Sequence, residues 1–155
     1  MAETLRIGLI GAGANTRTKH IPGFQAIDGV EIVAVCNRSP ESGHRVADAF
    51  GIGRVETDPE ALFRDPGIDA ICIGTWPYRH REYAVRALEA GKHVLTEKLM
   101  GQTVGKCKSM GRVSKKTQKH LATGHQRHYS ILYDNAVDVI KRGLIGELHH
   151  IRAQW

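Results

Sequence analysis

The sequence predicts an α/β protein whose doubly wound parallel sheet carries helices on both faces. Short apolar runs alternate with helix-competent segments along most of the chain, and this alternation is typical of parallel sheets. The first run, Leu5 to Ile10, passes directly into Gly11-Ala12-Gly13 and then into a helical segment. That order of strand, glycine turn and helix is how dinucleotide-binding domains build a seat for a diphosphate.

In the first half of the chain, β-branched runs and helix caps mark the expected elements. The run VEIVAVC, residues 30–36, predicts a buried strand. Ser39-Pro40-Glu41 supplies a cap, a proline and an acid for the start of a helix that ends at Gly51. A short strand over 54–56 follows, and Asp58-Pro59 repeats the start of a helix.

The second half of the chain continues the same alternation. Ile68 to Ile73 (IDAICI) predicts another buried strand, and Gly91 predicts a left-handed end for the helix before it. The remaining expected elements are a helix over 79–90, a strand over 93–97, a helix over 103–118, a strand over 120–123 and a helix over 129–142.

The last nine residues have a different pattern. From Glu147 to Trp155 apolar and polar residues alternate, which is typical of a half-buried strand in a mixed or antiparallel sheet. We therefore expect a Rossmann domain over 1–124, followed by a helix and a strand over 125–155. A free strand edge recruits partners, so we expect either a homo-oligomer through the C-terminal strand over 147–155 or fraying of that segment.

Composition narrows the class of protein. With 41% hydrophobic and 25% charged residues in 155, the chain reads as one ordinary globular domain with no membrane-spanning run. The N-terminus has no basic segment before its apolar run, so no signal peptide is expected. The three cysteines lack CxxC spacing, which favours reduced thiols and a cytoplasmic protein.

The net charge of +6 raises the question of nucleic acid. Most of the excess lies on one predicted helix, between Lys106 and Lys119, which has no aromatic residues for stacking bases. We interpret that run as the solvated face of an amphipathic helix, so nucleic acid is not expected as a partner. His125 and His128 are three residues apart but have no acidic or cysteine ligand beside them, and no metal is expected.

Polar or turn-forming residues follow four of the expected strands. They are Gly11 to Thr16, Asn37-Arg38, Gly74 to Pro77 and Glu97-Lys98. In open α/β sheets ligands bind outside the carboxyl ends of the strands, so these four segments predict one site.

The residues after the second strand indicate which coenzyme binds. Proteins that hold NAD normally place Asp or Glu there for the ribose hydroxyls. Asn37 can instead bond a hydroxyl without repelling a phosphate, and Arg38 can pair with a 2′-phosphate or stack on adenine. The sequence therefore favours NADP over NAD.

Taken together, these motifs resemble the N-terminal half of the Gfo/Idh/MocA family, the relatives of glucose–fructose oxidoreductase and inositol dehydrogenase. The resemblance runs through the whole chain. The matching pieces are GLIGAG, VEIVAVCNRSPE, IDAICIGTWPYRH, ALEAGKHVLTEK, GHQRHY and GLIGELHHIRAQW. It implies a Rossmann domain that binds NAD(P), with hydride transfer to or from a sugar, cyclitol or related hydroxyl carbon.

By resemblance, each matching position carries a role. The residues expected to bind the coenzyme are Gly11, Gly13, Ala14 and Asn15 at the diphosphate, Asn37 and Arg38 at the adenosine ribose, Thr75, Trp76, Pro77 and His80 around the nicotinamide half, and Glu97 at the nicotinamide ribose. Lys98 is the expected catalytic residue beside the substrate hydroxyl. Because an ordinary lysine is protonated near neutral pH, we expect it to polarise the hydroxyl and relay protons rather than act as the sole base.

Three departures from the family pattern bear on these roles. Leu99 replaces the proline that normally fixes the turn after the lysine, and Thr16 replaces the third glycine of the fingerprint. By resemblance, residues 125–155 lead into a truncated substrate domain, whose remainder would lie beyond Trp155 and supply the usual catalytic Asp or His partner. Two interpretations stay open: the coenzyme half of an oxidoreductase that acts on a small polyol or sugar, or a dinucleotide-binding module without turnover.

Overall fold

The computed structural model describes residues 4–154 of the chain. The chain divides into two compact units, Met1–Gly124 and His125–Trp155. Each unit is described by itself below.

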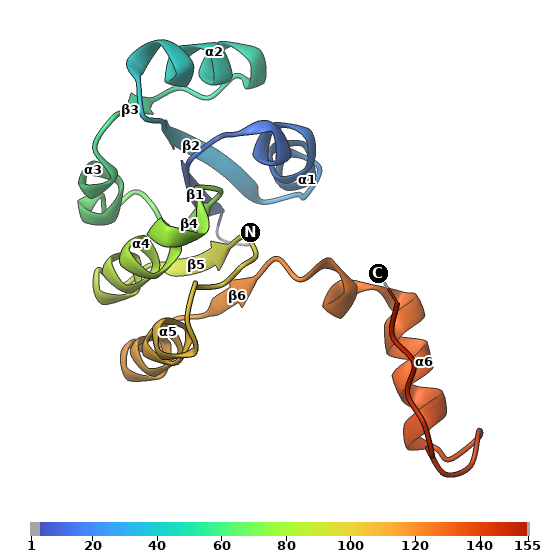
Figure 1. Ribbon diagram of the computed structural model, residues 1–155. Helices are drawn as coiled ribbons and strands as arrows, with labels where there is room; N and C mark the ends of the chain where they lie inside the picture. Colours follow the sequence, from blue (N-terminus) through green and yellow to red (C-terminus); the bar gives the residue numbers. More distant parts are fainter. Residues whose placement is uncertain (1–3, 155) are drawn as a thin grey trace. The chain divides into compact units, whose positions relative to one another are not determined.

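The first unit is built on a six-stranded sheet in which every neighbouring pair is parallel. Its strands are β1 (Leu5–Ile10), β2 (Val30–Cys36), β3 (Val55–Glu56), β4 (Ala70–Ile73), β5 (His93–Thr96) and β6 (Leu121–Thr123). Their order across the sheet is β3-β2-β1-β4-β5-β6, so the chain reverses its direction of winding between β1 and β4 (Figure 1). This is the strand order of a Rossmann fold, which confirms the predicted fold class.

Three of the helices of the first unit begin after residues whose side chains cap them. After β1 come a π-helical turn η1 (Thr16–His20) and α1 (Ile21–Gln25), and later α2 (Pro40–Phe50), α3 (Pro59–Arg64), α4 (Pro77–Glu89) and α5 (Val104–Thr117). Ser39, Asp58 and Thr103 cap the N-termini of α2, α3 and α5 through their side-chain oxygens. Gly51, at the end of α2, has a left-handed φ of 69°. No helix in the described part of the chain is both long enough and apolar enough to cross a membrane.

Two apolar clusters lie on the two faces of the sheet. One joins strand residues such as Ile73 and Val94 to the inner sides of α3, α4 and α5, and includes Leu88 and Met110. The other packs Leu9 and Val35 against the segment with Ile21 and against α2 (Figure 1). The parallel strands are therefore covered on both faces, as their β-branched runs predict.

The second unit contains a 3₁₀ turn η2 (Gln126–Tyr129) and the helix α6 (Ile131–Lys141). The strand predicted over 147–155 is not formed: residues 147–154 pair with no other strand, and Trp155 lies outside the described residues. Alternating polarity favours a strand only where a neighbouring strand accepts its backbone hydrogen bonds. Large apolar side chains of this unit are exposed, with Ile131 84%, Leu132 78% and Ile151 79% accessible.

Candidate functional site

The polar segments that follow the strands meet at the carboxyl edge of the sheet. Backbone hydrogen bonds connect each to its neighbour: Gly11 N–H to Cys36 C=O at 2.9 Å, Gly74 N–H to Ile10 C=O at 2.9 Å and Glu97 N–H to Ile73 C=O at 3.0 Å. Because these bonds extend the strand pairing into the loops, they hold the loops close together at one edge.

The glycine turn after β1 has one closed side and one open side. Gly11 has a φ of +84°, and a Cβ on it would lie 2.7 Å from the Thr75 side chain. Gly13 is exposed, and a Cβ on it would meet nothing within 4 Å. Gly11 therefore allows the backbone to make the turn. The open backbone at Gly13 leads into the helical segment and leaves room for a ligand.

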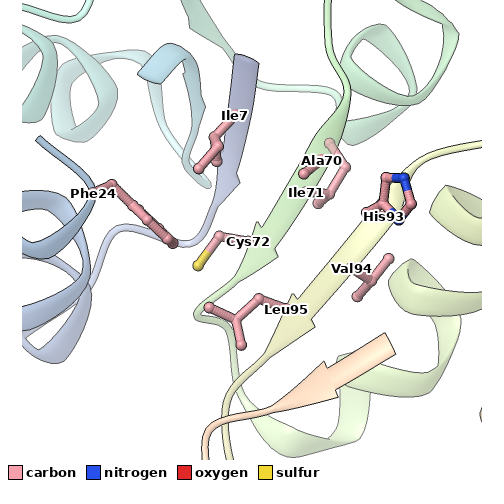
Figure 2. Close-up of a pocket in the computed structure, with 8 residues that line it drawn as sticks. All are labelled: Ile7, Phe24, Ala70, Ile71, Cys72, His93, Val94 and Leu95. Atoms are coloured by element: carbon pink, nitrogen blue, oxygen red, sulfur yellow. The ribbon is translucent and has the colours of Figure 1, made fainter. Parts of the chain in front are cut away.

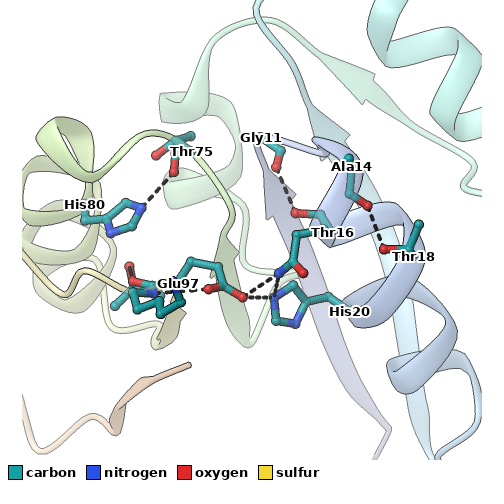
Figure 3. Close-up of polar contacts among 11 residues, drawn as sticks. Gly11, Ala14, Thr16, Thr18, His20, Thr75, His80 and Glu97 are labelled. Carbon is teal, nitrogen blue, oxygen red and sulfur yellow. Dashed lines mark hydrogen bonds and ion pairs between the residues drawn. The ribbon is translucent and has the colours of Figure 1, made fainter. Parts of the chain in front are cut away.

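Thr16, at the third position of the glycine fingerprint, is 2% exposed and packs inside the turn. Its hydroxyl donates to the Gly11 carbonyl at 3.1 Å (Figure 3). A Cβ on Gly74 would lie 2.2 Å from the Thr16 hydroxyl oxygen and 2.6 Å from the Gly11 carbonyl oxygen. The threonine is thus accommodated because the facing loop has a glycine where the two segments touch.

Asn37 supports the glycine turn from the end of β2. Its side-chain oxygen accepts the Ala12 N–H at 2.8 Å, and its amide nitrogen donates to the Ser42 carbonyl at 3.1 Å. The sequence predicts that Asn37 meets a ribose, and in the structure its amide holds the glycine turn. Arg38, beside it, is exposed.

A cluster of three side chains joins the first helical segment to the end of β5. The Glu97 Oε1 atom lies 2.7 Å from the Asn15 amide nitrogen and 2.6 Å from His20 Nε2 (Figure 3). His20 and Glu97 side chains are only 18% and 19% exposed. Sequence reasoning missed His20, although a histidine within two turns of the glycine turn was an available signal.

His80 lies between two of the site loops. It is completely buried, with Nε2 2.8 Å from the Thr75 carbonyl oxygen (Figure 3) and Nδ1 2.6 Å from the Leu99 carbonyl oxygen. The side chain predicted to border a coenzyme is thus enclosed by protein. Trp76, the N-cap of α4, is 73% exposed, and Pro77 begins that helix.

The turn after β5 presents Lys98 to solvent. The backbone N–H of Lys98 donates to Oε2 of Glu97 at 3.1 Å, and the peptide between Lys98 and Leu99 is cis. The Lys98 and Leu99 side chains are both exposed. The two neighbouring side chains therefore have different surroundings. The Glu97 carboxylate contacts Asn15 and His20, whereas the Lys98 ammonium is exposed to solvent.

Two buried thiols lie near this edge. Burial, with smaller contributions from Asp58 and Glu56, raises the pKa of Cys36 to about 12. Burial, with a smaller contribution from Glu97, raises the pKa of Cys72 to about 12. Since only a thiolate is a nucleophile or a metal ligand, both cysteines are inert parts of the core. Among residues 4–154, no group of three or more His, Cys, Asp or Glu side chains is arranged to hold a metal ion.

A cavity of about 150 Å³ lies on the face of the sheet that α1 borders. Figure 2 shows Phe24 on one side of it and the strand residues Ile7, Cys72 and Leu95 around it. Its lining is almost entirely apolar and offers no cluster of hydrogen-bond donors for an anion. The carboxyl edge is therefore the candidate functional site, because the open glycine turn and the exposed cations Arg38 and Lys98 belong to it.

Comparison with known proteins shows which family the chain resembles. Residues 5–125 match the GFO_IDH_MocA family model, described as an oxidoreductase family with an NAD-binding Rossmann fold. The chain is 35% identical over 141 residues to 1,5-anhydro-D-fructose reductase from Ensifer adhaerens, which covers 91% of this chain and 42% of the relative. It is 33% identical over 146 residues to inositol 2-dehydrogenase from Azotobacter vinelandii, which covers 93% and 43%.

A solved structure resembles the chain closely as well. A 3-ketoreductase from Actinomadura kijaniata, crystallised with NADP and TDP-benzene, superimposes with a TM-score of 0.83 at 27% identity. The match covers 94% of this chain and 44% of the ketoreductase. The chain thus spans less than half the length of the relatives it matches.

Proposed function

Because this chain belongs to the Gfo/Idh/MocA oxidoreductase family and its residues 5–125 form an NAD-binding Rossmann domain, we propose that it is the coenzyme-binding part of an oxidoreductase that transfers hydride between a nicotinamide and a hydroxyl carbon. The single observation that carries the proposal is the link between the open glycine turn and the Glu97–Lys98 turn, made by the 2.7 Å bond from Asn15 to Glu97. A nicotinamide dinucleotide has a diphosphate at its centre and a reactive nicotinamide ring at one end, and this edge offers a group for each.

The residues present fit such a coenzyme. A side chain at Gly13 would enter open space, so the backbone there is free for a phosphate to approach. We propose that Gly11, Gly13, Ala14 and Asn15 form the diphosphate seat, that Asn37 and Arg38 meet the adenosine ribose, that Thr75, Trp76 and Pro77 border the nicotinamide half, and that Glu97 meets the nicotinamide ribose. Together these segments span the carboxyl ends of β1, β2, β4 and β5.

We propose NADP rather than NAD as the preferred coenzyme. Arg38 is exposed, and neither position 37 nor position 38 carries an acid that would repel a 2′-phosphate. The ketoreductase that superimposes on the chain was crystallised with NADP. A guanidinium can form paired, charge-assisted hydrogen bonds to a phosphate, so the arginine has the chemistry for this contact.

Lys98 is the proposed catalytic residue. When bound, the nicotinamide supplies or accepts the hydride. The exposed Lys98 ammonium would then donate a hydrogen bond to the substrate oxygen, which offsets the charge that develops there. Glu97, held by Asn15 and His20, fixes the start of the turn that carries the lysine.

The substrate class is a further part of the proposal. The relatives named above are a 1,5-anhydro-D-fructose reductase, an inositol 2-dehydrogenase and a 3-ketoreductase, which supports a sugar, cyclitol or related hydroxyl compound. Titration of the chain with NADPH and NADH, followed by a turnover assay on sugars and inositols, tests the proposal. Binding with turnover supports the enzyme, binding without turnover supports a dinucleotide-binding module, and no binding of either nucleotide excludes both.

We also propose that the chain associates with itself through its second unit. The exposed apolar side chains of Ile131, Leu132 and Ile151 support this association. The strand edge expected from the sequence does not support it, because residues 147–154 form no strand. A cytoplasmic location is proposed as well, and the unpaired cysteines, which are Cys36, Cys72 and Cys107, support it.

A further inference from the structure

His80 is fully buried at the start of α4, yet both of its ring nitrogens contact backbone carbonyl groups. Nε2 lies 2.8 Å from the Thr75 oxygen and Nδ1 lies 2.6 Å from the Leu99 oxygen. The two carbonyls belong to different loops, one after β4 and one after β5. The imidazole therefore connects the two loops beyond the point where strands β4 and β5 pair.

The turn after β5 has few other anchors. Its side chains at Lys98 and Leu99 point to solvent, with Leu99 62% exposed, so apolar packing of these two residues does not fix it. Its backbone is held on one side by the Lys98 N–H bond to Glu97 Oε2 at 3.1 Å. The Leu99 carbonyl, one residue further on, is held by His80.

We propose that His80 is a positioning residue, which sets the Glu97–Lys98 turn against the Thr75 loop by donating its Nδ1 proton to the Leu99 carbonyl. This inference rests on the proposed function for its consequence, because the turn carries the proposed ribose contact and the proposed catalytic lysine. His80 itself touches neither coenzyme nor substrate in this account. It acts through the Leu99 backbone.

Two conservative variants separate this role from a general contribution to stability. The Nδ2 of an asparagine is as many bonds from the backbone as Nδ1 of histidine, so His80→Asn keeps a donor toward Leu99. The Nε2 of a glutamine is as many bonds away as the Nε2 of histidine, so His80→Gln keeps a donor toward Thr75 instead. Each variant keeps a group at one of the two carbonyl contacts and loses the other together with the buried ring, so both should lower the melting temperature by similar amounts.

The expected result is that the two variants differ at the turn. In the coenzyme-free chain, His80→Gln should shift the backbone amide resonances of Lys98 and Leu99, whereas His80→Asn should leave them near their wild-type positions. NADPH affinity should fall roughly tenfold in His80→Gln and stay close to wild type in His80→Asn, since one hydrogen bond is at stake. Equal changes at Lys98 in the two variants would overturn the proposal.

A measurement on the wild-type chain decides the matter without any variant. Long-range ¹H–¹⁵N spectra of the histidine rings report which nitrogen carries a proton. A proton on Nδ1 of His80 supports the proposal, and an Nδ1 without a proton overturns it. Because the ring and amide spectra need no coenzyme, a chain that binds neither nucleotide would refute the proposed function while these spectra still decide the role of His80.

Discussion

The Nε2 atom of His20 lies 2.6 Å from the Oε1 atom of Glu97, although the two residues are 77 positions apart. The contact joins the helical segment after the glycine turn to the end of β5 (Figure 3). Asn15 donates to the same oxygen at 2.7 Å, so one carboxylate connects the proposed diphosphate seat to the turn that carries Lys98. The two ends of the site are thereby set at a defined separation before any ligand binds.

Because both side chains are mostly buried, substitutions at His20 and Glu97 should have non-additive effects on the free energy of unfolding. A double-mutant cycle with His20→Ala and Glu97→Ala should give a coupling energy of about 1 kcal/mol in urea unfolding. The exposed pair Arg79–Glu82, whose atoms lie 2.6 Å apart on the surface of α4, is the control and should give only about 0.3–0.5 kcal/mol. Strictly additive effects of the two alanine substitutions at His20 and Glu97 would contradict this account.

Alanine substitutions at the two glycines of the turn should have different effects, one on stability and the other on NADPH binding. Gly11→Ala should lower the free energy of unfolding by about 1–2 kcal/mol or more, because the residue has a φ of +84° and its new methyl group would meet Thr75. Gly13→Ala should leave thermal stability nearly unchanged, because its methyl group meets nothing, yet weaken NADPH binding roughly tenfold by standing where a phosphate approaches. Calorimetry and fluorescence titration of both variants provide the check. An alanine at Gly13 that binds NADPH as well as the wild type does would place the diphosphate elsewhere.

Arg38→Ala should change the choice of coenzyme. Loss of charge-assisted bonds to the 2′-phosphate should weaken NADPH binding by about 10- to 100-fold while leaving NADH binding nearly as it was. Titration of both nucleotides at two salt concentrations provides the measurement, with Arg45→Ala on the exposed side of α2 as a charge-matched control. If NADPH and NADH weaken equally, Arg38 does not contact the 2′-phosphate.

Low pH should lower the free energy of unfolding by breaking the Arg6–Asp69 ion pair, which lies at the end of the sheet opposite the site. Hydrogen bonds from the Arg6 guanidinium, and then from its backbone N–H, hold the pKa of Asp69 below its ordinary value. The pKa of an aspartate in the unfolded chain is about 3.9. The pairing with Arg6 therefore stabilises the fold above about pH 4, and this stabilisation is lost as the pH falls through the lower pKa of the folded state. Asp69→Asn should therefore be less stable than wild type at pH 7, and the difference should shrink below about pH 4.

Urea unfolding at neutral and acidic pH measures that difference. Asp48→Asn, on the exposed side of α2, makes the same change in charge and is the control. A stability difference between wild type and Asp69→Asn that stays constant down to the lowest pH would show that the ion pair does not carry the effect.

The exposed apolar side chains of the second unit should produce association that depends on concentration. Sedimentation velocity should show a growing fraction of dimer or larger species for the wild type, and Leu132→Lys with Ile151→Lys should reduce it. Val104→Lys is the control, because Val104 is 71% exposed but lies on α5 of the first unit. A wild type that remains monomeric at high concentration would contradict the proposed association.

Local signals were enough to place nearly all of the first unit. The runs at Leu5–Ile10 and Val30–Cys36 became β1 and β2 with those bounds, because a buried parallel strand needs continuous apolar, β-branched residues. Ser39 and Asp58 cap helices as expected, since a cap involves only residues within one turn. The strand expected after Glu147 failed for the opposite reason: its hydrogen bonds require a partner strand that no local pattern supplies.

The sequence by itself determined the strand–helix order, the glycine turn and the gathering of polar segments at one sheet edge, because these follow from nearest neighbours along the chain and from the rules of parallel sheets. The tertiary structure alone decided which donor meets which acceptor: the Asn37 amide at Ala12, the His20 ring at Glu97 and the His80 ring between two carbonyls. Three of these four pairs join residues at least 19 positions apart in the chain, and a hydrogen bond depends on tenths of an ångström that only the packed fold sets.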